Sequence, residues 1–145
     1  MKKSYILITP VHDEEEFIEE TIKSVVSQSI VPVQWLIVDD ASEDRTPQII
    51  TDYQQRYDFI NYYRLERGDI KSYYSRRAEV FLAGYEKIMH MEYDYIAALD
   101  ADLELKQDYY EAILTEFHNN SKLGIASGVY LEMQKADLQY WRKHH

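Results

Sequence analysis

The chain has 145 residues, of which 46% are apolar, and it carries a formal net charge of −10. This length suits one domain with a single core. The lack of cysteine argues against a disulfide scaffold or a thiolate metal site, and the acidic surplus argues against nucleic acid as a partner. No apolar run reaches the roughly 20 residues of a transmembrane segment, and the N-terminus becomes polar too early for a signal peptide. We therefore expect one domain over residues 1–145, located in the cytoplasm, with the inner face of the membrane as an alternative.

Short apolar runs and helical spacings alternate along the chain. Residues 5–8 form an apolar run that predicts a buried strand. Asp13 and Glu16 have the spacing of a capping box, and the apolar residues after them predict a helix over about residues 14–28. Thr46 is expected to be the N-cap of the next helix, with Pro47 at its first position.

The same patterns predict the remaining elements. Further strands are expected at residues 36–38, 60–65, 95–99 and 123–130, and further helices at residues 76–91 and around 110–117. Strands that alternate with helices indicate an α/β fold with a mainly parallel sheet. Right-handed crossovers then place helices on both faces, which gives a Rossmann-like three-layer α/β/α sandwich.

Carboxylates are concentrated in the segments that follow the predicted strands. These segments are residues 10–14, 39–42 and 100–102. In a parallel sheet the loops after the strands meet at one edge, which is where ligands of such folds bind. Two carboxylates about 4 Å apart repel by roughly 4 kcal/mol at an effective dielectric constant of about 20. A raised pKa, a basic partner or a bound cation can relieve this repulsion.

The Asp100-Ala101-Asp102 sequence suits a hard cation such as Mg²⁺ or Mn²⁺. Such an ion takes one or two carboxylates and completes its shell with water and substrate phosphate. An Asp-x-Asp pair alone is weak support, because acidic residues are also common at helix N-termini. The pair Asp39-Asp40 is equally ambiguous, because the segment from Asp40 to Ser42 could serve only as a helix cap and a turn. The two acidic motifs together, each after a buried strand and 60 residues apart, are more informative.

Five segments resemble the motifs of glycosyltransferase family 2, whose members are inverting enzymes with the GT-A fold. The segments are residues 9–15 (TPVHDEE), 24–28 (SVVSQ), 36–46 (LIVDDASEDRT), 99–103 (LDADL) and 123–128 (LGIASG). The resemblance covers the chain from Tyr5 to about Met133. It implies a sugar transfer from a nucleoside-diphosphate sugar, linked to UDP or GDP, to a hydroxyl of a glycan or lipid acceptor.

The resemblance also implies roles for residues at the nucleoside end of the site. Pro10, Val11 and Glu14 would line the base and ribose. Asp40 would accept a hydrogen bond from the base, and Asp39 would support Asp40.

At the diphosphate end, Asp100 would lie near the ribose or sugar. Asp102, with Asp100 beside it, would hold the Mg²⁺ or Mn²⁺ ion that bridges the diphosphate. The cation would neutralise charge on the leaving nucleoside diphosphate.

Several residues depart from the family pattern. His12 replaces a Tyr and could stack on the base or only occupy a capping loop, and Asp13 replaces an Asn. Ala41 replaces a Gly, so this turn need not use a positive φ. Leu82 stands where the family often has Asn.

Three arginines, Arg67, Arg76 and Arg77, could contact a diphosphate. The sequence favours solvated arginines that balance an acidic surface.

The segment after Gly128 offers no convincing catalytic base, since Glu132 and Asp137 are its only acids. An inverting transfer needs a carboxylate to deprotonate the acceptor. The chain is therefore expected to be the donor-binding half of the enzyme, truncated before the acceptor-binding half. A non-catalytic nucleotide-binding or assembly domain of the same fold is the main alternative. A phosphoacceptor receiver domain and a nucleotidyltransferase are weaker alternatives, because the acidic pair follows the second strand and the first loop lacks glycine.

Overall fold

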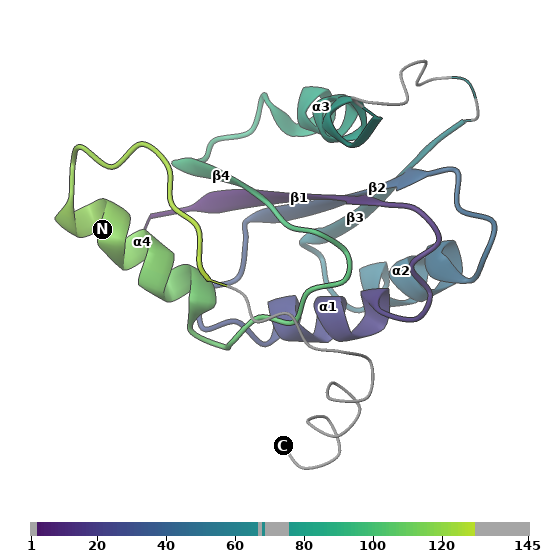
Figure 1. The fold of residues 1–145 in the computed structure, drawn as a ribbon, viewed down its shortest axis with the longest axis horizontal. Helices are drawn as coiled ribbons and strands as arrows, with labels where there is room; N and C mark the ends of the chain where they lie inside the picture. Colours follow the sequence, from purple (N-terminus) through teal and green to yellow (C-terminus); the bar gives the residue numbers. More distant parts are fainter. Residues whose placement is uncertain (1–2, 67, 69–75, 130–145) are drawn as a thin grey trace, which may run out of the picture. The chain divides into compact units, whose positions relative to one another are not determined.

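The computed structural model describes residues 3–66, 68 and 76–129. The chain divides into two compact units, Met1–Glu111 and Ala112–His145, and each is described by itself. The elements, in chain order, are β1 (Tyr5–Val11), α1 (Ile18–Val26), β2 (Gln34–Asp40), α2 (Thr46–Gln54), β3 (Ile60–Leu65), α3 (Arg76–Ile88), β4 (Tyr95–Ala98) and α4 (Tyr109–Asn119) (Figure 1).

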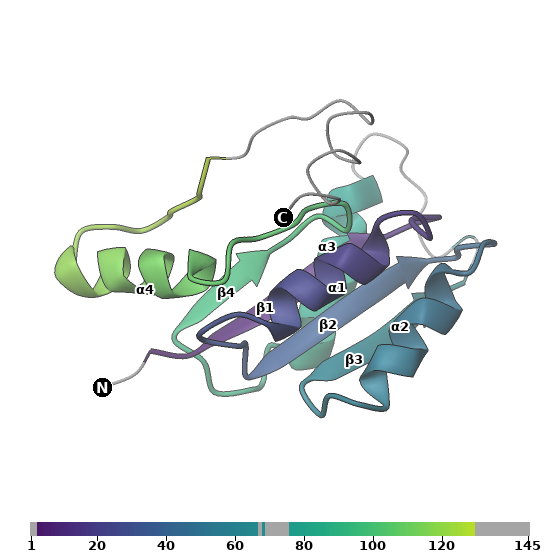
Figure 2. The ribbon, with the colours of Figure 1, turned by 90° about the horizontal axis from the view of Figure 1, so that it is seen from below.

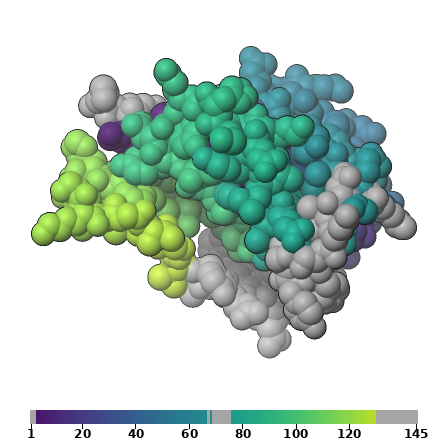
Figure 3. All heavy atoms as spheres, turned by 90° about the horizontal axis from the view of Figure 1, so that it is seen from above, coloured from purple at the N-terminus to yellow at the C-terminus, as the bar shows by residue number. Residues whose placement is uncertain are grey.

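In the first unit the described strands form a parallel sheet with the order β3-β2-β1-β4. Helix α3 lies on one face of this sheet, and α1 and α2 lie on the other (Figures 1 and 2). In the space-filling view from the α3 side, the teal and green atoms of the α3 region occupy the middle of the visible face of the first unit (Figure 3). The predicted α/β class, the mainly parallel sheet and the helices on both faces are confirmed.

The two central strands, β1 and β2, are buried on both faces and form the middle of the core. The face beneath α3 contributes Ile6, Ile8, Leu36 and Val38 to one apolar cluster. On the other face, Trp35 is fully buried, and its indole N–H donates to the Thr9 hydroxyl at 2.9 Å. These strands hold the loops at their C-terminal ends on a rigid support.

The first helix begins later than the capping-box pattern predicts. Asp13 adopts a left-handed φ of 49° and is not the N-cap; Phe17 directly precedes α1. The segment between them finds other partners, because the Glu14 and Glu15 amides donate to Thr46 Oγ1 (2.8 Å) and Asp44 Oδ2 (3.0 Å). The side chains of Asp44 and of Thr46, the first residue of α2, thus bind two amides that precede α1.

The second helix begins one residue earlier than expected. Thr46 is the first residue of α2, and Arg45 takes the cap position. Such shifts by one residue are normal at helix ends.

The predicted fifth strand is not present in the described part of the second unit. Residues 123–129 have no regular secondary structure, and Tyr130 lies outside the described residues. The exposed fraction is 86% for Ile125 and 97% for Val129. An apolar run becomes a strand only when its backbone pairs with a neighbouring strand, and hydropathy alone does not supply that partner.

Among the described residues, no helix combines the length and apolarity that crossing a bilayer requires.

Candidate functional site

A cavity of about 360 Å³ opens at the C-terminal edge of the sheet in the first unit. Its walls come from the β1–α1 loop, the end of β2, the first turns of α3 and the segment after β4. The lining residues are Pro10, Val11, His12, Glu14, Asp40, Arg76, Arg77, Val80, Ala101 and Asp102. Six of them were expected from the sequence to form a nucleotide-sugar and metal site. The fold therefore brings together most of the residues that the motifs single out.

A second cavity, of about 390 Å³, adjoins the first. His12, Asp40 and Arg76 line both cavities, and Ala41 and Gly68 line only the second. The pair formed by Asp40 and Arg76 therefore lies where the two spaces meet.

Asp39 does not line either cavity, although it neighbours Asp40 in the chain. Successive side chains of a strand point to opposite faces, and Asp39 lies on the face opposite α3. Its carboxylate is fully buried and accepts hydrogen bonds from Tyr62 Oη (2.5 Å), Arg64 Nη1 (2.7 Å) and the Ser42 amide (2.9 Å). Burial and the bond to Asp39 raise the pKa of Tyr62 to about 12, so this tyrosine stays a donor. The expected support of Asp40 by Asp39 remains a prediction.

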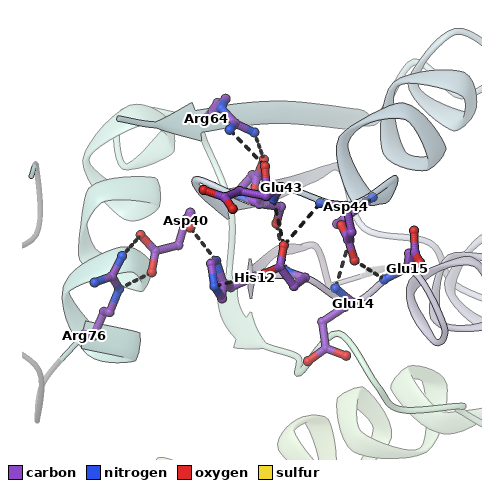
Figure 4. A network of polar contacts seen from close by, with 12 residues as sticks. His12, Glu14, Glu15, Asp40, Glu43, Asp44, Arg64 and Arg76 are labelled. Carbon is purple, nitrogen blue, oxygen red and sulfur yellow. Dashed lines mark hydrogen bonds and ion pairs between the residues drawn. The ribbon is translucent and has the colours of Figure 1, made fainter. Parts of the chain in front are cut away.

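Asp40 lies on the α3 face and forms a bidentate ion pair with Arg76 (Figure 4). Arg76 Nη2 is 2.8 Å from Asp40 Oδ1, and its Nε contacts Oδ2. The fork of the guanidinium holds both carboxylate oxygens in one plane. A carboxylate has about four lone-pair sites, so Asp40 can still accept a bond from a ligand.

The Asp-x-Asp segment after β4 faces the same region. Asp102 is exposed and lines the cavity, whereas Asp100 is half-buried and pairs with Arg77 at 3.3 Å. The sequence favoured solvated roles for Arg76 and Arg77. The structure instead places each beside a carboxylate of the site, and Arg67 lies outside the described residues. The repulsion expected among clustered carboxylates was the signal that could have predicted these partners.

Glu14 interacts electrostatically with the other acids of the site. Burial raises the pKa of Glu14, and the negative charges of Asp102, Asp44 and Asp100 raise it further, whereas Arg77 lowers it. The carboxylates of Glu14, Asp40 and Asp102 thus line the cavity together with two arginines of α3, Arg76 and Arg77. A cation or a cation-bound diphosphate would relieve this repulsion.

The β1–α1 and β2–α2 loops are joined by hydrogen bonds along their length (Figure 4). His12 Nδ1 donates to the Asp40 carbonyl (2.7 Å), and Asp13 Oδ1 accepts from the Glu43 amide (2.7 Å). Glu15 Oε2 accepts from the Arg45 amide at 3.0 Å. Several acids of the two motifs thus bind backbone amides and hold the two loops together.

The turn after β2 uses a positive φ although its residue is not a glycine. Ala41 has a φ of 55°, which is the left-handed conformation that a glycine adopts without strain. The buried bond between Asp39 Oδ1 and the Ser42 amide closes this turn and holds Ala41 in it. A buried hydrogen bond across the turn therefore overrides the local preference of alanine.

The described residues hold no group of three or more His, Asp or Glu side chains arranged to bind a metal. Asp102, with Glu14 and Asp100 nearby, can supply one or two carboxylates. This number and chemistry fit Mg²⁺ or Mn²⁺, because such ions complete their shell with water and phosphate oxygens.

The parallel sheet and the acidic cavity at the C-terminal ends of its strands define an α/β domain with its candidate ligand site at that edge. The sequence matches the model of Glycosyl transferase family 2 over residues 6–145, and the chain belongs to this family. The family match, more than the fold, decides against a receiver domain and a nucleotidyltransferase.

The chain is 30% identical over 117 residues to a poly-beta-1,6-N-acetyl-D-glucosamine synthase of Staphylococcus epidermidis. The match covers 81% of this chain and 26% of the relative, so the chain spans about a quarter of that protein's length.

Two solved structures show the same fold. TarS 1–349 of S. aureus in complex with UDP-GlcNAc has a TM-score of 0.65 at 18% identity, over 80% of this chain and 31% of that one. Mannosyltransferase PcManGT of Pyrobaculum calidifontis, in complex with GDP-Man and Mn²⁺, has a TM-score of 0.60 at 17% identity. This match covers 81% of this chain and 33% of the other. The expected GT-A fold is confirmed.

Proposed function

We propose that this chain is the donor-binding part of an inverting glycosyltransferase that uses a UDP- or GDP-linked sugar and a divalent metal. The cavity at the sheet's C-terminal edge carries this proposal, because it gathers residues from three separate loops. The ligands bound in the two structural neighbours, UDP-GlcNAc and GDP-Man with Mn²⁺, support the same class of donor.

In the proposed site the nucleoside lies near Pro10, Val11, His12 and Asp40. The Asp40 carboxylate accepts an N–H of the base, and the ring of His12, fixed by its bond to the Asp40 carbonyl, offers a flat surface for stacking. Glu14 faces the ribose.

At the other end of the cavity, Asp102 would hold the metal together with Asp100. When bound, the metal neutralises the charge that develops on the leaving nucleoside diphosphate. Arg77 lines the same end and can donate to a phosphate oxygen once Asp100 turns to the metal. We assign no catalytic base to this chain, so the activity proposed for it alone is binding.

The proposed domain is residues 1–145, acting with an acceptor-binding half. We propose the cytoplasm, or the inner face of the membrane, as its location on composition alone. A binding or assembly domain of the same fold would bind nucleotide equally well. Assays of sugar transfer by a longer chain that contains residues 1–145 distinguish the two.

The test is thermal melting with UDP and with GDP, each with and without Mn²⁺ or Mg²⁺. At 100 times the dissociation constant, binding adds about 2.7 kcal/mol, which raises the melting temperature of a domain of this size by roughly 5–10 °C. A rise with one nucleotide, dependent on metal, is expected and would identify the base. No rise with either nucleotide would refute the proposal.

Asp102→Asn removes the proposed metal ligand with little change in volume. We expect it to abolish the metal-dependent part of the rise. Asp108→Asn is the matched control, since Asp108 is exposed in the segment that precedes α4 and lies outside both cavities. An equal loss in both variants would show that Asp102 is not the ligand.

A further inference from the structure

Arg64 connects the edge strand β3 to the turn that carries Asp40. Its Nη1 donates to Asp39 Oδ2 at 2.7 Å, and its Nη2 donates to the Ser42 carbonyl at 2.9 Å. One guanidinium therefore holds both ends of the four-residue turn 39–42. Tyr62, two residues earlier on the same face of β3, donates to the same carboxylate oxygen at 2.5 Å.

A further hydrogen bond joins this turn to the β1–α1 loop, which also lines the cavity. Ser42 is buried, and its hydroxyl accepts the Asp13 amide at 2.9 Å. Asp13 lies between His12 and Glu14, which both line the cavity. A displacement of Ser42 would therefore move the loop that carries these two side chains as well as the turn that carries Asp40.

In the described part of the chain, neither cavity is lined by Asp39, Tyr62 or Arg64. Asp39, Tyr62 and Arg64 lie on the sheet face opposite α3, whereas the cavity opens on the α3 side. Their influence on a ligand must therefore pass through the backbone of the turn.

We propose that Arg64, with Tyr62, is a positioning residue for the donor site. Through Asp39 and Ser42 it fixes the turn that presents Asp40 and the loop that presents His12 and Glu14. The inference rests on the proposed function for its ligand, but the positioning itself can be measured without a ligand. Ala41 makes such support necessary, because an alanine at a φ of 55° leaves that conformation readily when the turn is released.

The experiment compares Tyr62→Phe, Arg64→Lys and Arg64→Gln with Tyr63→Phe as the matched control. Tyr63 is the adjacent residue of β3 and packs on the opposite face, where its ring meets the ammonium of Lys87 at 4.6 Å. Tyr62→Phe removes one hydroxyl and keeps the ring. Arg64→Lys keeps the charge but cannot span Asp39 and the Ser42 carbonyl with a planar fork.

Two quantities are measured on folded protein at 25 °C: the amide hydrogen-exchange rates of Ser42 and Asp13, and the dissociation constant for UDP or GDP with Mn²⁺. We expect Tyr62→Phe and Arg64→Lys to speed exchange at both amides at least fivefold and to weaken nucleotide binding by five- to twentyfold. Arg64→Gln should do more, and Tyr63→Phe should change both quantities by less than twofold.

A merely structural role gives a different result. A lower melting temperature with unchanged exchange at Ser42 and Asp13 and an unchanged dissociation constant would overturn the proposal, because stability loss alone leaves the affinity of folded molecules intact. If the unaltered protein binds neither nucleotide, the proposed function fails, and the exchange rates still decide whether Arg64 holds the two loops.

Discussion

Asp39 and Asp40 are adjacent in the chain, but their side chains lie on opposite faces of the sheet. Asp39 is fully buried against Tyr62 and Arg64, and Asp40 faces the cavity and Arg76. Strand alternation at the end of β2 thus separates one acidic pair into a carboxylate that holds the turn and a carboxylate that can meet a ligand.

This separation predicts that the same substitution, Asp to Asn, lowers stability more at Asp39 than at Asp40. Asp39→Asn weakens three hydrogen bonds to a fully buried carboxylate and should lower the free energy of unfolding by about 2–3 kcal/mol. Asp40→Asn loses an ion pair whose arginine is largely solvated and should cost about 1 kcal/mol or less. Urea denaturation measures both.

Asp40→Asn should affect nucleotide binding more than it affects stability. The variant keeps its fold but offers the base an amide in place of a charged acceptor, which we expect to weaken binding about tenfold or more in calorimetric titration. A stable Asp39→Asn together with an unstable Asp40→Asn would contradict the division of roles.

The raised pKa of Glu14 should make the stability of the protein depend on pH. In the folded state this pKa is raised, chiefly by burial and by the charge of Asp102. As pH rises from its ordinary pKa to the raised one, the unfolded chain releases this proton while the folded chain keeps it, so stability falls. Below the ordinary pKa both states are protonated and the effect disappears. Glu14→Gln should therefore melt at a higher temperature than the unaltered protein at pH 7 and at the same temperature near pH 4.

The control for this substitution is Glu92→Gln, at an exposed position between α3 and β4. It should give parallel melting curves at both pH values. The opposite result would be a Glu14→Gln variant that melts below the unaltered protein at pH 7 and at the same temperature near pH 4. That result would show that the folded protein stabilises Glu14 as an anion.

The order of strands and helices was predictable because apolar runs and helical spacings are local signals. The faces of Asp39 and Asp40 were not. Leu36, Ile37 and Val38 are buried on both sides of a central strand, so hydropathy does not alternate and gives no mark of which face each acid takes.

The joined loops were missed for a different reason. The bonds between Asp13 and Glu43 and between Glu15 and Arg45 connect residues about 30 positions apart. The capping-box spacing of Asp13 and Glu16 is equally consistent with a helix start, so only the tertiary contact decides. The predicted strand at 123–130 failed because an apolar run does not specify a pairing partner.

Ala41→Gly should stabilise the protein. The left-handed φ of 55° costs an alanine roughly 1–2 kcal/mol, and glycine avoids this cost while losing one buried methyl and some entropy on folding. The net gain should be about 0.5 kcal/mol. Ala83→Gly, inside α3, has no such strain to relieve and should lose about 1 kcal/mol. Urea denaturation measures the change in the free energy of unfolding for both variants. A change of the same sign in Ala41→Gly and Ala83→Gly would contradict this account of the turn.

Gly84→Ala should destabilise the protein although alanine favours helices. Gly84 faces the sheet from the middle of α3, and an added Cβ would lie 2.5 Å from Val38 Cγ2 and 3.2 Å from Ile8 Cγ2. The helix would have to move from the strands that support the cavity, at a cost of about 1–3 kcal/mol, against a propensity gain of about 1 kcal/mol. Gly124→Ala, which meets nothing within 4 Å, is the control and should change stability by less than about 0.5 kcal/mol. Urea denaturation decides, and a Gly84→Ala variant more stable than the unaltered protein would show that α3 does not need this close approach.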